Sequence, residues 1–165
     1  LKDYVAGDFR QGVELIAWTT LGFGILLYAA DRLGLRIRRV EHMTIGAALF
    51  IGLAQILALV PGTSRSGITM TAARFLGFER IEAARFSLVL SIPVIIGAGT
   101  LAGAELYQMG NAEMNIATGL AIVFSFGAAL IAIAVMMRWL ERASFTPFVI
   151  YRICLGAGLL YWVYG

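Results

Sequence analysis

The stretch PGTSRSGITM, residues 61–70, gathers glycine, hydroxyl and arginine residues between two apolar arms. Pro61 opposes continuation of a helix, and Gly62 permits a turn that other residues resist. A second helix starting near Ser64 would point its first N–H groups and a partial positive charge at this turn, which favours an anion such as phosphate. The stretch therefore predicts either an anion-binding tip or a purely structural kink with close helix packing.

Arg65 is the residue that favours the anion site. A buried arginine at membrane depth is costly unless it is paired or hydrated, and its planar guanidinium suits bidentate contact with phosphate oxygens. Thr69 lies four residues later and would share the same helical face. Ser64 and Ser66 add further hydroxyl donors. The pattern is not a P-loop, because the GK[ST] ending is missing.

The composition places this tip in a membrane protein. The chain has 165 residues, of which 60% are hydrophobic and 14% charged, with a mean hydropathy of +0.85. A soluble domain carries about a quarter charged residues. No basic cluster is interleaved with aromatic residues, so we expect no nucleic-acid partner.

Apolar runs long enough to cross a bilayer, which takes about 20 residues, predict the membrane spans. They cover residues 12–30, 83–107, 115–137 and 147–164. Between the first two spans, residues 43–78 contain an apolar arm, the tip and a second arm too short to cross. We therefore predict one all-α membrane domain over residues 1–165, built as a helical bundle.

Charge placement decides how residues 43–78 run. The connections at residues 31–42, 74–85 and 138–142 are rich in arginine, whereas residues 105–114 carry only Glu105 and Glu113. Basic connections collect on the cytoplasmic side. All basic connections share that side only if residues 43–78 enter and leave by the same face. We therefore predict a re-entrant helix–loop–helix with its tip at residues 61–66 and both chain ends outside.

The tip and its flanks resemble a known family. PGTSRSGITM is similar to the PGxSRSG signature of the bacterial undecaprenyl-pyrophosphate phosphatases of the bacitracin-resistance type. The flanks that agree are GLAQILALVPG, RFLGFERIEAARFSLVLSIPVIIGA and TPFVIYR. The resemblance runs from about Glu41 to the C-terminus and, more weakly, through the first span.

The resemblance implies a fold and a missing part. The family's fold is a bundle of membrane helices with paired re-entrant elements related as inverted repeats, and this chain resembles its C-terminal half. The family's acidic E-x-x-x-E segment and its Pro-x-Ser-Ser-x-Gly-His tip are absent here, and the lone His42 stands in an arginine-rich loop. We expect an N-terminal half to be missing and the fragment alone to be inactive.

The resemblance also implies an activity: hydrolysis of undecaprenyl diphosphate to undecaprenyl phosphate and inorganic phosphate, which recycles the lipid carrier of peptidoglycan synthesis in the bacterial inner membrane. A divalent cation, Mg²⁺ or Ca²⁺, is expected in the intact protein, with its ligands in the missing half and no metal ligand in this chain. The expected partners are the polyprenyl diphosphate, membrane lipid, the missing half and a second copy in a homodimer. The expected catalytic residues are Ser64, Arg65, Ser66 and Thr69, and the expected substrate-binding residues are Gly62, Thr63, Gly67 and Gln55.

Some interpretations stay open at this point. A non-helical tip at membrane depth implies a polar cavity beside it, and Gln55 either lines this cavity or bonds another helix. Arg152 either has a structural role, for which snorkelling to the interface is one form, or faces the cavity. The main alternative function is half of a transporter or flippase for a phosphorylated lipid, which would need a sealed membrane to be measured.

Overall fold

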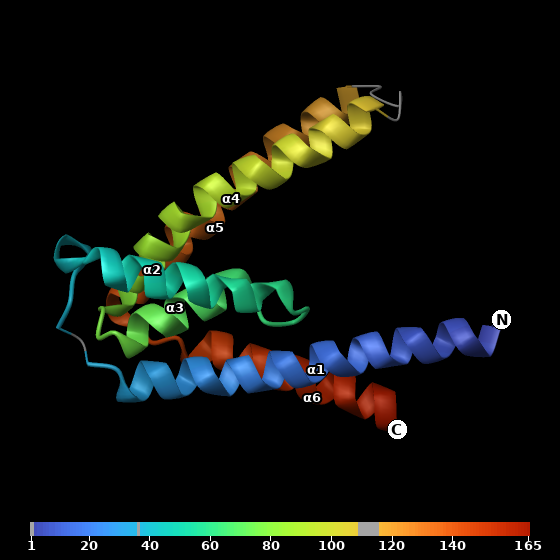
Figure 1. The fold of residues 1–165 in the computed structure, drawn as a ribbon, viewed down its shortest axis with the longest axis horizontal. Helices are drawn as coiled ribbons and strands as arrows, with labels where there is room; N and C mark the ends of the chain where they lie inside the picture. The colour runs from blue at the N-terminus through green and yellow to red at the C-terminus, as the bar shows by residue number, and fades with distance from the viewer. Residues whose placement is uncertain (1, 36, 109–115) are drawn as a thin grey trace. The chain divides into compact units, whose positions relative to one another are not determined.

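The computed structural model describes residues 2–35, 37–108 and 116–165, and its fold is drawn in Figure 1. These residues form helices and no β-strand, which confirms the predicted all-α fold. The α-helices are α1 (Lys2–Leu33), α2 (Ile45–Ala54), α3 (Arg65–Phe75), α4 (Arg80–Gln108), α5 (Ile116–Arg142) and α6 (Thr146–Tyr164). Short 3₁₀ turns cover Val40–His42 and Gln55–Leu59.

Among the described residues, four helices are long and apolar enough to cross a membrane. They are Gln11–Leu33, Arg80–Glu105, Gly119–Arg142 and Thr146–Tyr164. Each overlaps one predicted span, and the helices run on into the charged flanks because helix geometry does not stop where the apolar run stops. Residue 115, where the third predicted span begins, lies outside the described residues.

A helical hairpin made of α2, the 3₁₀ turn Gln55–Leu59 and α3 lies beside α1 (Figure 1). Its turn meets α1 where the Thr19 hydroxyl donates to the Pro61 carbonyl at 2.6 Å. Its far end meets the last turn of α1, where Arg74 donates to the Asp31 carbonyl at 3.1 Å. The α3 arm therefore runs parallel to α1, and α2 runs in the opposite direction. This arrangement suits a re-entrant element, whose place in a bilayer stays a prediction.

The base of the hairpin holds a buried ion cluster of Asp31, Arg74 and Arg80. Asp31 Oδ1 lies 2.6 Å from Arg80 Nε and 3.4 Å from Arg74 Nε. Arg74 also donates to the carbonyls of Asp31 and Gly34 near the end of α1. The basic connection expected at residues 74–85 is thus mostly helical, and its Arg74 is fully buried rather than in a loop. These charges fasten α1, α3 and α4 together.

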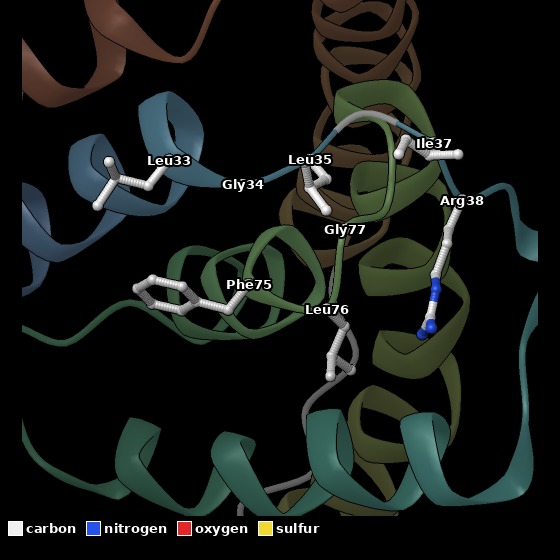
Figure 2. Close-up of a pocket in the computed structure, with 8 residues that line it drawn as sticks. All are labelled: Leu33, Gly34, Leu35, Ile37, Arg38, Phe75, Leu76 and Gly77. Carbon is white, nitrogen blue, oxygen red and sulfur yellow. The ribbon is translucent and has the colours of Figure 1, made fainter.

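A hollow of about 470 Å³ lies at this same end of α3, away from the turn of the hairpin. The link after α1 runs past the turn between α3 and α4, and the Ile37 and Arg38 amides donate to the Gly77 carbonyl at 3.2 and 3.0 Å. Figure 2 shows the residues that line the hollow: Leu33, Gly34, Leu35, Ile37, Arg38, Phe75, Leu76 and Gly77. Its lining combines apolar side chains with Arg38 and backbone groups, and none of the predicted site residues lies in it.

The described chain forms two compact units. One contains residues 1–87 and 144–165, and the other contains residues 88–143. In the first, α1 packs closely on α6 because Gly156 lacks a side chain: a Cβ there would lie 2.5 Å from Leu21 Cγ. The second holds most of α4 and α5, with many large apolar side chains exposed. The tip and its contacts described below belong to the first unit.

Candidate functional site

The turn of the hairpin requires glycine at position 62. Gly62 has φ +88°, which is the left-handed region that other residues rarely adopt. A Cβ there would lie 2.2 Å from Thr19 Oγ1 and 2.6 Å from the Ile16 carbonyl oxygen. The turn predicted from Pro61 and Gly62 is therefore confirmed, and α1 presses directly against it.

Ser64 begins α3 as its N-cap. Its Oγ accepts from the Gly67 amide at 3.2 Å and lies 3.5 Å from Ser66 Oγ. Its φ of +70° is strained for a residue with a side chain, and such strain persists only where the surroundings hold it. The second arm therefore starts where the sequence predicted. Both serines are exposed, and the first amides of α3 point toward the tip.

Arg65 is the first residue of α3 and is partly buried. Thr69, one turn later, is 1% exposed. The Thr69 hydroxyl contacts the carbonyls of Arg65 and Ser66 at 3.0 and 3.1 Å, and lies 2.7 Å from Ser87 Oγ on α4. That hydroxyl binds α3 to α4 in the interior. A direct role of Thr69 on phosphate stays a prediction, and the contacts seen here are structural.

The Arg152 side chain extends from α6 to the tip. Its Nη2 donates to the carbonyls of Gly62 and Thr63 at 2.8 and 2.9 Å, and its Nε donates to the Thr20 carbonyl at 3.3 Å. The residue is 9% exposed. Arg152 therefore turns inward, and the idea that it snorkels to the interface is wrong. Its position joins α6, α1 and the tip.

Gly67 leaves a bare surface between two polar groups. A Cβ at this position would lie 2.9 Å from Arg152 Nη1 and 3.2 Å from Ser64 Oγ. One edge of the Arg152 guanidinium holds the tip carbonyls, so the Nη1 edge faces the start of α3. A guanidinium edge, a hydroxyl and a helix N-terminus thus converge where the α-carbon of Gly67 is uncovered. That combination is suited to an anion.

Thr63 and Gln55 are the two remaining predicted site residues. Thr63 is fully buried, and within the described chain its hydroxyl has no hydrogen-bond partner. Gln55 stands where α2 changes to a 3₁₀ turn, and its side chain is partly buried. Among the described residues, no side-chain hydrogen bond joins Thr63 or Gln55 to Ser64 or Gly67. Their roles toward a substrate stay predictions.

The residues that sequence reasoning missed lie on α1. Thr19 Oγ1 donates to the Pro61 carbonyl at 2.6 Å, and Thr20 Oγ1 donates to the Gly62 carbonyl at 3.3 Å. Two adjacent threonines inside an apolar span were the available signal. With Arg152, they hold every carbonyl from residue 61 to residue 63.

The described residues contain no group of three or more His, Cys, Asp and Glu side chains able to hold a metal ion. The groups at the tip are hydroxyls, amides and guanidinium groups, which suit an anion rather than a cation. His42 is exposed in the link after α1, where its Nδ1 lies 3.4 Å from the Arg39 amide. The residues described here therefore do not fit the divalent cation that the resemblance implies.

Comparison with known proteins addresses the family. Residues 1–158 match the family model described as bacitracin resistance protein BacA. The chain belongs to this family. The match includes the whole of α1, where the resemblance seen in the sequence was weaker than after Glu41. Family membership and the apolar helices together make the chain a multi-pass bacterial inner-membrane protein.

Relatives that are similar to most of this chain carry the name undecaprenyl-diphosphatase. The chain is 56% identical over 161 residues to undecaprenyl-diphosphatase 1 of Rhodospirillum rubrum, covering 97% of this chain and 57% of the relative. It is 49% identical over 164 residues to the undecaprenyl-diphosphatase of Alteromonas mediterranea, covering 99% and 61%. It is 48% identical over 157 residues to the undecaprenyl-diphosphatase of Roseobacter denitrificans, covering 95% of this chain and 59% of the relative. The chain spans less than two thirds of the length of each of these relatives.

Proposed function

We propose that the chain supplies the phosphate-binding tip of an undecaprenyl-diphosphate phosphatase. The observation that carries the proposal is the bare Gly67, flanked by Arg152 Nη1 and Ser64 Oγ at the start of α3. The names of the relatives support the same chemistry. The reaction would return the lipid carrier to peptidoglycan synthesis and confer resistance to bacitracin.

The proposed reaction breaks one phosphoanhydride bond. An oxygen nucleophile bonds to the terminal phosphorus, the bond from that phosphorus to the bridging oxygen breaks, and the bridging oxygen leaves on undecaprenyl phosphate. Water supplies the oxygen and the protons of the inorganic phosphate. Phosphoryl transfer needs chiefly positioning and charge stabilisation, and Arg65, Ser64 and Ser66 would provide these to the transferred group.

The parts of the reaction that need a base are not supplied by the tip. None of its residues is a carboxylate or an imidazole. In the proposal, the acidic motif implied by the resemblance activates the nucleophile, and any Mg²⁺ or Ca²⁺ would bind there and neutralise charge on the diphosphate. Without these groups, the chain by itself is expected to release no phosphate.

The test is phosphate release from undecaprenyl diphosphate in detergent micelles. The chain is joined to the part of the Rhodospirillum rubrum relative that it does not cover, and assayed as it stands, with Arg65→Ala, and with Arg142→Ala. Loss of a charge-stabilising donor costs about a hundredfold or more in rate, so Arg65→Ala should fall by that factor. Arg142, exposed at the end of α5, is the matched control and should change little.

Two results would contradict the proposal. Equal rates with and without the Arg65 guanidinium, in protein with unchanged melting temperature, would leave the tip a structural element. Absence of turnover in micelles, with movement of a phosphorylated lipid across sealed vesicles, would favour the transporter instead.

A further inference from the structure

A shallow groove of about 380 Å³ runs along one face of α1. Its lining residues are spaced as one side of a helix, a turn apart. They are Trp18, Thr19, Gly22, Phe23 and Leu26. Apart from the Thr19 hydroxyl and the Trp18 indole N–H, its side chains are apolar.

The groove is lined by α1 alone and adjoins the tip through one residue, Thr19. Thr19 lines it, and the same Thr19 hydroxyl donates to the Pro61 carbonyl at 2.6 Å. From Thr19 the groove follows α1 to Leu26, a rise of about 10 Å along the helix. In the predicted orientation α1 starts at the outer face, so the groove crosses the middle of the candidate span near Gly22 and runs on toward its cytoplasmic half.

The shape of the groove depends on Gly22. A Cβ at that position would meet nothing within 4 Å, so the floor is open there. Trp18 is 56% exposed beside it. Trp18 stands seven residues after Gln11, the start of the candidate span, and so about 10 Å from that end. That depth is unlike an anchor at the headgroup level, where membrane tryptophans usually gather.

We propose that this groove holds the first isoprene units of the polyprenyl chain whose diphosphate binds at the tip. The inference rests on the proposed function and adds the place of the tail. A lipid diphosphate has its apolar chain attached directly to its charged head, so a head at Ser64 and Gly67 needs an apolar path that starts at the tip. The groove at Thr19 meets that need, and its direction lets the rest of the chain reach the bilayer interior.

The groove would act mainly by alignment. A polyprenyl chain is surrounded by apolar groups both in lipid and in the groove, so hydrophobic burial contributes little and packing contributes the difference. Filling the groove should therefore move the tail to another path and turn the diphosphate at the tip. The effect should grow with the length of chain that must be rerouted.

The experiment fills the groove with Gly22→Leu and compares a long with a short substrate. The control is Gly158→Leu on α6, where a Cβ also meets nothing within 4 Å. In the joined protein, kcat/KM is measured for undecaprenyl and for farnesyl diphosphate. Binding is measured separately on the chain in micelles, by labelling with a polyprenyl diphosphate that carries a photoreactive group on its first isoprene units.

The expected result is that Gly22→Leu lowers kcat/KM for the long substrate about fivefold more than for the short one, consistent with a few lost packing contacts. Gly158→Leu should leave the ratio unchanged, and the label should attach between residues 18 and 26. An unchanged ratio of kcat/KM between the two substrates, or label on other segments, would overturn the proposal. If neither substrate is hydrolysed but the label still attaches to α1 and Gly22→Leu removes it, the phosphatase proposal fails while the groove stands.

Discussion

Gly67 is the residue whose missing side chain keeps the anion position open. It lies in the first turn of α3, and a methyl group there would sit 2.9 Å from Arg152 Nη1. Arg152 cannot easily withdraw, because its Nη2 and Nε are held by the carbonyls of Gly62, Thr63 and Thr20. The bare α-carbon thus keeps the anion position open.

We predict that Gly67→Ala lowers phosphate release in the joined protein far more than it lowers the melting temperature. The preference of a helix for alanine over glycine, about 0.5–1 kcal/mol, offsets part of the cost of moving Arg152 and Ser64 away from the added methyl group, so the melting temperature should fall only slightly. The added methyl group would displace the phosphate, and a small misplacement costs up to about a hundredfold in rate. The control is Gly46→Ala in α2, where a Cβ meets nothing within 4 Å. Full activity of the Gly67 variant would show that no anion sits there.

At the scale of elements, the contact between α1 and α6 fixes where Arg152 stands. It depends on Gly156, since a Cβ there would lie 2.5 Å from Leu21 Cγ and 3.1 Å from the Ala17 carbonyl oxygen. Arg152 is one turn earlier on α6. Any change that pushes α6 away from α1 also withdraws the guanidinium from the tip.

We therefore predict that Gly156→Val lowers the free energy of unfolding by about 1–3 kcal/mol, the usual cost of overpacking. Gly158→Val, two residues along the same helix, should have little effect because a Cβ there meets nothing within 4 Å. Denaturant titration in micelles measures both. Equal stability of the two variants would mean that α1 and α6 are not packed this closely.

The elements also show what could be read from the sequence. Apolar runs predicted the long helices, and Pro61, Gly62 and Ser64 predicted the turn and the start of α3, because each acts through its own backbone. Contacts between distant segments could not be read in this way. Arg152 meets Gly62 ninety residues away in the chain, and the Thr69 hydroxyl meets Ser87 on α4 as well as two carbonyls of its own first turn. Such pairings depend on how the helices pack.

For the whole molecule, charge and depth together orient the site. The candidate span of α1 runs from Gln11 to Leu33. Thr19, which contacts the tip, lies about 12 Å along the helix from Gln11 and about 21 Å from Leu33. The arginine-rich link that follows Leu33 is the predicted cytoplasmic end. Asp31 neutralises only one of the two positive charges of Arg74 and Arg80 with which it pairs, and the link after α1 keeps its own arginines.

We predict that the tip is reached from the outer face of the inner membrane. In a Cys154→Ser background, Ser66→Cys should react with a membrane-impermeant maleimide added from the periplasmic side, because Ser66 is exposed at the tip. Arg39→Cys, exposed in the link after α1, should react only after the membrane is opened. A bilayer's hydrocarbon core is about 30 Å thick, so the reagent should not reach both positions from one side. The reverse labelling pattern would mean that the molecule has the opposite orientation in the membrane, and labelling of both from outside would mean that the tip and the link after α1 are reached from the same side of the bilayer.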